Sequence, residues 1–165
     1  MGRPLILAAA LTCLALTAAG CGASDSPTQQ SAAATRTLDR IEQICNTWNA
    51  SVTGRQFPVD NFDPKHPDAA DLPSVGDYFA PAVKAEQDAL ASIRALTPPP
   101  ELTQDVQTYT AALAKLVDVV KEQVDAARAS DPQRFVATLD RADTELAAVG
   151  TAADQLRVKS CRADG

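Results

Sequence analysis

The chain has 165 residues, of which 45% are hydrophobic and 4% aromatic, and its formal net charge at pH 7 is −6. This length fits one modest domain and excludes a multidomain protein, while a pI near 4.7 argues against binding to nucleic acid. A single histidine, His66, further restricts metal-centred and nucleophilic chemistry.

Residues 1–20 have the three-part layout of a secretory signal peptide. Arg3 provides a basic start, an apolar stretch runs from Leu5 to Leu11, and small residues precede Cys21. The segment is shorter and richer in alanine than a membrane-spanning helix, which needs about 20 apolar residues. We therefore expect residues 1–20 to be removed after export.

The end of this segment, LTAAGC over residues 16–21, resembles the lipobox of bacterial lipoproteins, although Ala18 stands where such boxes most often carry leucine. The resemblance implies cleavage after Gly20 and attachment of a diacylglycerol to Cys21. The mature chain would then be held by its lipid on the outer face of the cytoplasmic membrane. The alternative is an ordinary secreted protein in which Cys21 is unmodified.

The four cysteines fit the same compartment. Cys13 would leave with the signal peptide and Cys21 would carry the lipid, so Cys45 and Cys161 remain as the two thiols in an oxidising setting. A disulfide between them would close a loop of 116 residues, for which chain-entropy models give about 4 to 5 kcal/mol. A redox or metal-binding thiol pair is the alternative, which the absence of C-x-x-C spacing disfavours.

Residues 21–33 carry no large apolar side chain, which predicts a lipidated flexible tether in front of a helical domain over residues 34–165. Four stretches of that domain repeat apolar residues at steps of three and four, as amphipathic helices do. They cover about 34 to 53, about 74 to 97, the residues after Pro100 to about 124, and residues 132–156. Gly54 is expected to end the first helix, and residues 74–77 to form a capping box at the start of the second.

The apolar stripes of these stretches predict the core. They comprise Leu38, Ile41, Cys45, Trp48 and Val52; Val75, Phe79, Ala82 or Val83, Leu90, Ile93 and Leu96; Leu102, Val106, Tyr109, Leu113, Leu116 and Val120; and Phe135, Leu139, Ala142, Leu146, Val149, Ala153 and Leu156. Strands are not supported, because no run alternates apolar and polar residues. Short connections force antiparallel neighbours, so we expect an all-α, up-down four-helix bundle in which one disulfide joins the first and last helices. Gly150 is expected to mark a kink or a close helix contact.

The one long connection, residues 54–73, offers the strongest candidate ligands for a cation. Long loops are often functional, and this one contains a histidine and four aspartates: His66, Asp60, Asp63, Asp68 and Asp71. The spacing of a calcium loop is absent and one histidine cannot build a zinc cluster. We favour a proline-stiffened crossover that packs Phe57 and Phe62 over the bundle, and the sequence predicts no metal residues and no cofactor.

Single residues on or beside the stripes admit a second interpretation. Trp48, Tyr78 and Tyr109 could line a ligand pocket, although aromatic residues at such positions more often belong to the core. Glu86 lies among apolar neighbours in the second stretch and could be a buried functional carboxylate, although a flank position reaching water is favoured. No nucleophile–base arrangement or glycine-rich phosphate loop is visible, so no catalytic residue is predicted.

The layout as a whole resembles small exported lipoproteins of high-GC actinobacteria. The likeness rests on the lipobox, on CNTW at residues 45–48, on LTPPPEL at residues 96–102 and on Cys161. It implies location and architecture, and carries no active-site residues. We expect a non-catalytic binding or interaction module whose partner is an envelope protein or a small molecule. The alternatives are a small-ligand or metal-ion carrier using residues 54–73, and an envelope hydrolase with a carboxylate pair.

Overall fold

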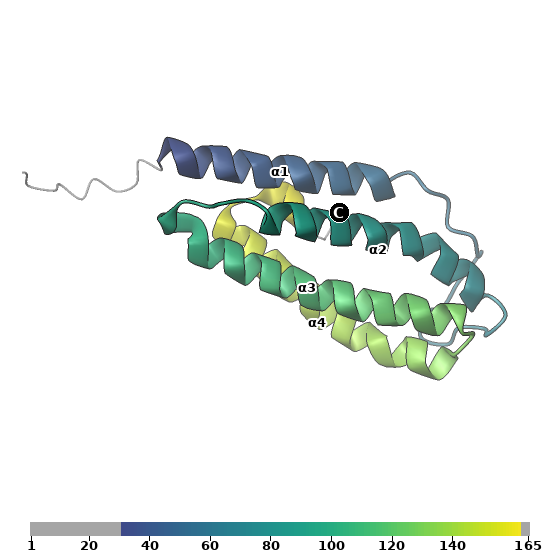
Figure 1. The fold of residues 1–165 in the computed structure, drawn as a ribbon. Helices are drawn as coiled ribbons and strands as arrows, with labels where there is room; N and C mark the ends of the chain where they lie inside the picture. The colour runs from purple at the N-terminus through teal and green to yellow at the C-terminus, as the bar shows by residue number, and fades with distance from the viewer. Residues whose placement is uncertain (1–30, 163–165) are drawn as a thin grey trace, which may run out of the picture.

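The computed structural model describes residues 31–162, which form an all-helical bundle. Its elements are α1 (Ala32–Val52), α2 (Leu72–Arg94), α3 (Pro100–Arg128), α4 (Pro132–Leu156) and the short 3-10 helix η1 (Lys159–Cys161), with no strand in the described range. Consecutive helices run antiparallel (Figure 1), which confirms the predicted up-down topology. The predicted signal peptide, Cys21 and residues 22–30 of the predicted tether lie outside the described residues.

The first helix begins earlier than predicted and ends where expected. Ser31 is its N-cap, because the Ser31 Oγ accepts a hydrogen bond of 3.1 Å from the backbone N–H of Ala34. Residues 32 and 33, assigned above to the tether, are therefore helical. Gly54 follows the helix at φ +79°, a left-handed conformation in which a side chain would be strained.

The second helix differs from prediction at both ends. It starts at Leu72, and its N-cap is Asp71, whose side chain makes no capping hydrogen bond. Ser74 lies inside the first turn, so the predicted capping box is wrong. The helix ends at Arg94, three residues before the predicted end. The run of prolines that starts at Pro98 explains this, because proline disfavours helical backbone in the residue before it.

The four helices do not pack equally. α3 packs along both α2 and α4, whereas α1 packs chiefly on α2 and on η1. The crossing of α2 and α3 is tight at Gly76, where an added Cβ would lie 2.9 Å from Cγ of Arg128. Gly150 shows the opposite, because no heavy atom lies within 4 Å of its added Cβ. The close helix contact predicted at Gly150 is therefore wrong.

The disulfide fastens α1 to the end of the chain. Cys45 of α1 is bonded to Cys161 of η1, as predicted. On either side of this bond α1 also hydrogen-bonds Ser160. Glu42 Oε1 accepts from the Ser160 N–H at 3.1 Å and from its hydroxyl at 2.7 Å, and Asn49 Nδ2 donates to the Ser160 carbonyl at 2.8 Å. The first helix thus reaches α4 through the residues that follow α4.

Most predicted stripe residues are buried and the long connection packs as expected, with Phe79 as an exception. Residues of the 54–71 connection pack on a second apolar cluster, with the Phe62 ring centroid 6.1 Å from that of Phe135 and the Phe57 centroid 5.1 Å from that of Tyr78. The predicted crossover is confirmed. Phe79, predicted as core, is 37% exposed. Its ring packs against Tyr78 at the surface, and the residue of this part of α2 that makes the close contact with α3 is Gly76.

Candidate functional site: a cavity within the bundle

A cavity of about 530 Å³ lies between the four helices. All of them contribute side chains near the middle of the bundle. We call it the Trp48–Glu86 cavity; it is lined by Trp48, Asn49, Val52, Thr53, Ala82, Glu86, Leu116, Val120, Ala142, Asp143, Leu146 and Arg162. Cavities of about 300 to 1,000 Å³ with mainly apolar walls and a few polar groups are the usual sites for small ligands.

The cavity exists because the apolar stripes do not meet completely. Four stripe residues expected in the core, Val52, Val120, Ala142 and Leu146, are only partly buried and face this space. They come from α1, α3 and α4. Since α1 packs on α2 and η1 rather than along α4, the apolar faces of α1 and α4 leave a gap between them. Helical periodicity places the residues on the correct face but contains no information about this spacing.

Glu86 supplies a carboxylate on the inner face of α2. It follows Val83 by three residues and precedes Leu90 by four, so it lies on the same helical face as these two buried residues. Its Oε2 atom is buried and has no hydrogen-bond partner among residues 31–162. Burial raises the pKa of Glu86 from its usual 4.5 to about 7. Glu86 as a whole is half-buried, which agrees with the expected flank position, but this oxygen does not reach water.

Trp48, which lines the same cavity, carries an unpaired donor. Its side chain is only 6% exposed, which confirms the expected core position. Its indole Nε1 is buried, however, and finds no acceptor within the described part of the chain. Buried indole N–H groups ordinarily have a partner, so this one is an exception that needs an explanation. Trp48 is therefore both a core residue and part of the cavity wall.

Beneath the cavity lies a buried phenol. Tyr109 has no exposed surface, as predicted for a core residue, and its hydroxyl donates to the Cys161 carbonyl at 3.4 Å. Burial raises the pKa of Tyr109 far above its usual value, and the nearby carboxylates of Glu86 and Glu42 raise it further. Tyr109 therefore stays a neutral hydrogen-bond donor close to both carboxylates.

The rim carries charges of both signs. Asp143 is exposed on α4, and Arg162 forms an ion pair of 3.3 Å with Asp154. A shallower extension of about 290 Å³ continues from the cavity along α4, past Leu146 and Gly150. Glu86 and Asp143 thus place two carboxyl groups around one concave space, one half-buried and one at the mouth.

The long connection does not assemble the predicted ligand set. His66 Nδ1 lies 2.9 Å from Asp63 Oδ2, and both side chains are largely exposed. Within residues 31–162, no group of three or more histidine, cysteine, aspartate or glutamate residues is placed so that it could hold a metal ion. Asp60, Asp68 and Asp71 therefore do not join His66 and Asp63 in a metal-binding group. The structure therefore favours the cavity over the loop as the candidate site.

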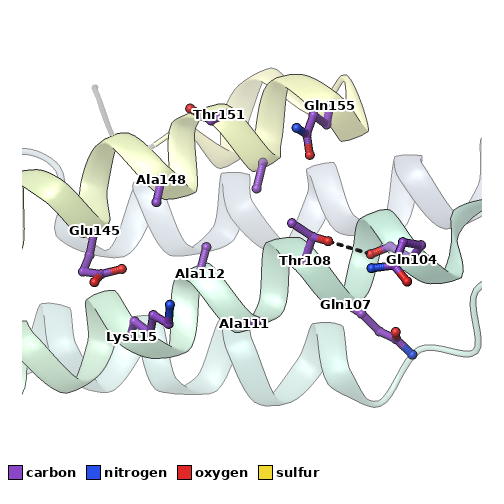
Figure 2. A pocket seen from close by; sticks show the side chains of 11 residues that line it. Gln104, Gln107, Thr108, Ala111, Ala112, Lys115, Glu145, Ala148, Thr151 and Gln155 are labelled. Atoms are coloured by element: carbon purple, nitrogen blue, oxygen red, sulfur yellow. Dashed lines mark hydrogen bonds between the residues drawn. The ribbon is translucent and has the colours of Figure 1, made fainter.

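A second concave surface runs between α3 and α4 on another face of the bundle (Figure 2). This α3–α4 groove has a volume of about 540 Å³ and is lined mostly by exposed alanine, threonine and glutamine side chains, with Lys115 and Glu145 on opposite sides. Its Thr108 hydroxyl donates to the Gln104 carbonyl at 3.0 Å. None of the residues that line the groove has a buried side-chain nitrogen or oxygen without a partner in the described structure.

Comparison with protein-family models, with curated proteins and with solved structures found no match to this chain. Across residues 31–162, none of the helices combines the length and the apolar character that crossing a membrane requires.

Proposed function

We propose that this protein is a lipid-anchored binding module on the outer face of the cytoplasmic membrane, which binds a small molecule in the Trp48–Glu86 cavity without catalysing a reaction. One observation carries the binding role: Glu86 and Trp48 both line the cavity, and each carries a buried polar atom, Glu86 Oε2 and Trp48 Nε1, with no partner in residues 31–162. Leaving such a group unpaired costs about 1 to 3 kcal/mol. A side-chain rotation that brings such an atom to a ligand in the cavity recovers that free energy on binding.

Ligand capture tests the binding role. Ala142 lines the cavity, so Ala142→Phe should fill it, whereas Ala137 is exposed on the same helix and Ala137→Phe is the matched control. Each protein is incubated with a small-molecule extract of cell envelopes and measured by native mass spectrometry. We expect a bound species with the wild type and Ala137→Phe but not with Ala142→Phe. Equal capture by both variants, or none by the wild type, would refute the proposal.

The anchor is supported by the lipobox-like residues 16–21 and is tested separately. Cys21→Ala should move the protein from the membrane fraction to the soluble fraction, because the lipid has lost its attachment site. Cys13→Ala is the control, since Cys13 belongs to the predicted signal peptide. Mass spectrometry of the N-terminal peptide should show a diacylglycerol on Cys21. Unchanged fractionation of Cys21→Ala would exclude lipid anchoring at this residue.

A hydrolase with a carboxylate pair is a second candidate function. The observation that favours it is that Glu86, with a pKa of about 7, and Asp143 line one cavity, as a general acid and its partner carboxylate do. The captured ligand distinguishes the two functions. A binding module returns it unchanged after prolonged incubation, whereas a hydrolase converts it and loses the conversion in Asp143→Asn while still binding.

A further inference from the structure

We infer that the ligand of the Trp48–Glu86 cavity is an organic cation: a protonated amine on an apolar body, with the Glu86 carboxylate as its counter-ion. The inference rests on the binding function proposed above and names the class of ligand.

The first argument is charge. Burial is the sole cause of the perturbation at Glu86, with no opposing contribution from a cation of the described chain. Near it lie Tyr109 from α3, with Glu42 of α1 beside that phenol, and Asp143 from α4, while Arg162 at the mouth is paired with Asp154. A buried carboxylate without a counter-ion is strongly unfavourable, and a bound cation that replaces its lost solvation relieves this cost. An anionic ligand would increase it.

The second argument is the shape and chemistry of the walls. Val52, Leu116, Val120 and Leu146 surround the carboxylate with apolar surface, which suits a hydrocarbon or aromatic body. The indole of Trp48 belongs to the same wall and adds aromatic surface to it. A bare divalent cation does not fit, because residues 31–162 place no group of three metal-binding side chains together.

A cation bound to Glu86 makes affinity depend on pH. Burial raises the pKa of Glu86 to about 7, so below this pH the free protein holds a neutral carboxyl that must lose its proton before it can pair with an ammonium group. Affinity for an amine should therefore rise by up to about tenfold per pH unit below pH 7 and level off above it. A neutral ligand of the same shape should lack this dependence.

The test uses three probes that share one apolar body: 4-phenylbutylamine, 4-phenylbutan-1-ol and 4-phenylbutyrate. Trp48 is the single tryptophan of the chain, so its fluorescence reports binding beside it, and the Glu86 variant below assigns that binding to the cavity. At pH 8 we expect the amine to bind at least about tenfold more tightly than the alcohol, with the carboxylate weakest. Between pH 5.5 and pH 8 the amine affinity should increase while the alcohol affinity stays constant.

Two variants assign the effect to Glu86. Glu86→Gln keeps the size of the side chain but removes its charge, so the amine and the alcohol should bind equally. Glu145→Gln removes a half-buried carboxylate from the α3–α4 groove and should preserve the tenfold preference. Because Glu86→Gln is not expected to weaken the fold, a change in preference reports on the site, and circular dichroism of both variants checks their helical content.

The outcomes separate this inference from the proposed function. Equal binding of amine and alcohol by the wild type, or a preference retained in Glu86→Gln, overturns the cation assignment while leaving a binding cavity in place. Failure of the amine to bind also overturns it. In every case the capture experiment with Ala142→Phe and Ala137→Phe decides the binding function independently, because it uses no assumption about ligand charge.

Discussion

The α3–α4 groove and the Trp48–Glu86 cavity have nearly equal volumes, about 540 and 530 Å³, but different chemistry. The groove is lined by solvated side chains, and its residues satisfy their buried polar atoms. Two residues of the cavity wall, Glu86 and Trp48, carry a buried carboxylate oxygen and a buried indole N–H, neither with a partner in residues 31–162. The comparison shows that volume does not identify a binding site. Unsatisfied polar groups inside it do, because a protein seldom retains them without a role.

The two concave surfaces also differ in what holds their walls. The groove lies between α3 and α4, which pack closely along their length. The cavity needs α1, and α1 is fastened to η1 by the Cys45–Cys161 bond and by hydrogen bonds to Ser160. Damage at this attachment should therefore change the cavity and spare the groove.

The largest effect is expected from removing the disulfide. The bond spans 116 residues, for which chain-entropy models give about 4 to 5 kcal/mol, so Cys45→Ala/Cys161→Ala should lose about that much free energy of unfolding. Urea denaturation measures it, and a red shift of Trp48 fluorescence should show that the cavity wall has loosened. Reductant should destabilise the wild type and leave the double variant unchanged. A double variant as stable as the wild type would contradict this role for the bond.

The second-largest effect is on the pH dependence of stability, and it distinguishes the carboxylate of Glu86 from that of Glu145. Because the folded-state pKa of Glu86 is raised from 4.5 to about 7, the folded protein holds a proton that the unfolded chain releases, and stability falls as pH rises from about 4.5 to 7. Glu86→Gln removes this loss and should stabilise the protein by up to about 3 kcal/mol at pH 8, with little effect at pH 4. Glu145→Gln should change stability by less than about 0.5 kcal/mol at either pH.

Urea unfolding at a series of pH values checks this pair. The expected result is a wild-type stability that declines between pH 4.5 and 7 and a Glu86→Gln curve without that decline. Parallel curves for the wild type and Glu86→Gln would mean that the Glu86 carboxylate is solvated in the folded protein.

The sequence predicted the fold well because the fold depends on short-range rules. Steps of three and four residues located all four helices, and the two cysteines outside the predicted signal peptide and the predicted lipid site identified the disulfide. The ends of α2 were missed, since Asp71 and Leu72 start it without a side-chain cap and Pro98 stops it early. Helical periodicity also assigned Phe79 to the core wrongly, because it cannot show that Gly76 makes the close contact with α3.

The candidate site was only partly visible in the sequence. The sequence indicates both Trp48 and Glu86 as candidate site residues. Glu86 stands out because it is a carboxylate among apolar neighbours. What could not be read is that α1 lies along α2 and η1 and leaves Ala142 and Leu146 partly uncovered. Periodicity assigns residues to a face of a helix, but the separation between helices depends on tertiary packing. The cavity therefore appears only in three dimensions.

A smaller effect tests how closed the bundle is away from the cavity. At Gly76 an added Cβ would lie 2.9 Å from Cγ of Arg128 and 3.1 Å from its backbone nitrogen, so α2 and α3 would have to separate. Gly76→Ala should therefore destabilise the protein by about 1 to 2 kcal/mol despite the better helix propensity of alanine. Thermal and urea denaturation measure the change. A stabilised variant would show that Arg128 and the α2–α3 crossing adjust without cost.

The smallest effect tests the open side at the extension of the cavity. Gly150 lies inside α4 and lines that extension, and no heavy atom lies within 4 Å of its added Cβ. Gly150→Ala should stabilise the protein by about 0.5 to 1 kcal/mol, because alanine loses less backbone entropy in a helix and meets no neighbour. Urea denaturation of this variant beside Gly76→Ala should give changes of opposite sign. Destabilisation by Gly150→Ala would mean that α1 or the C-terminal residues close onto α4 there, leaving no open space beside the cavity.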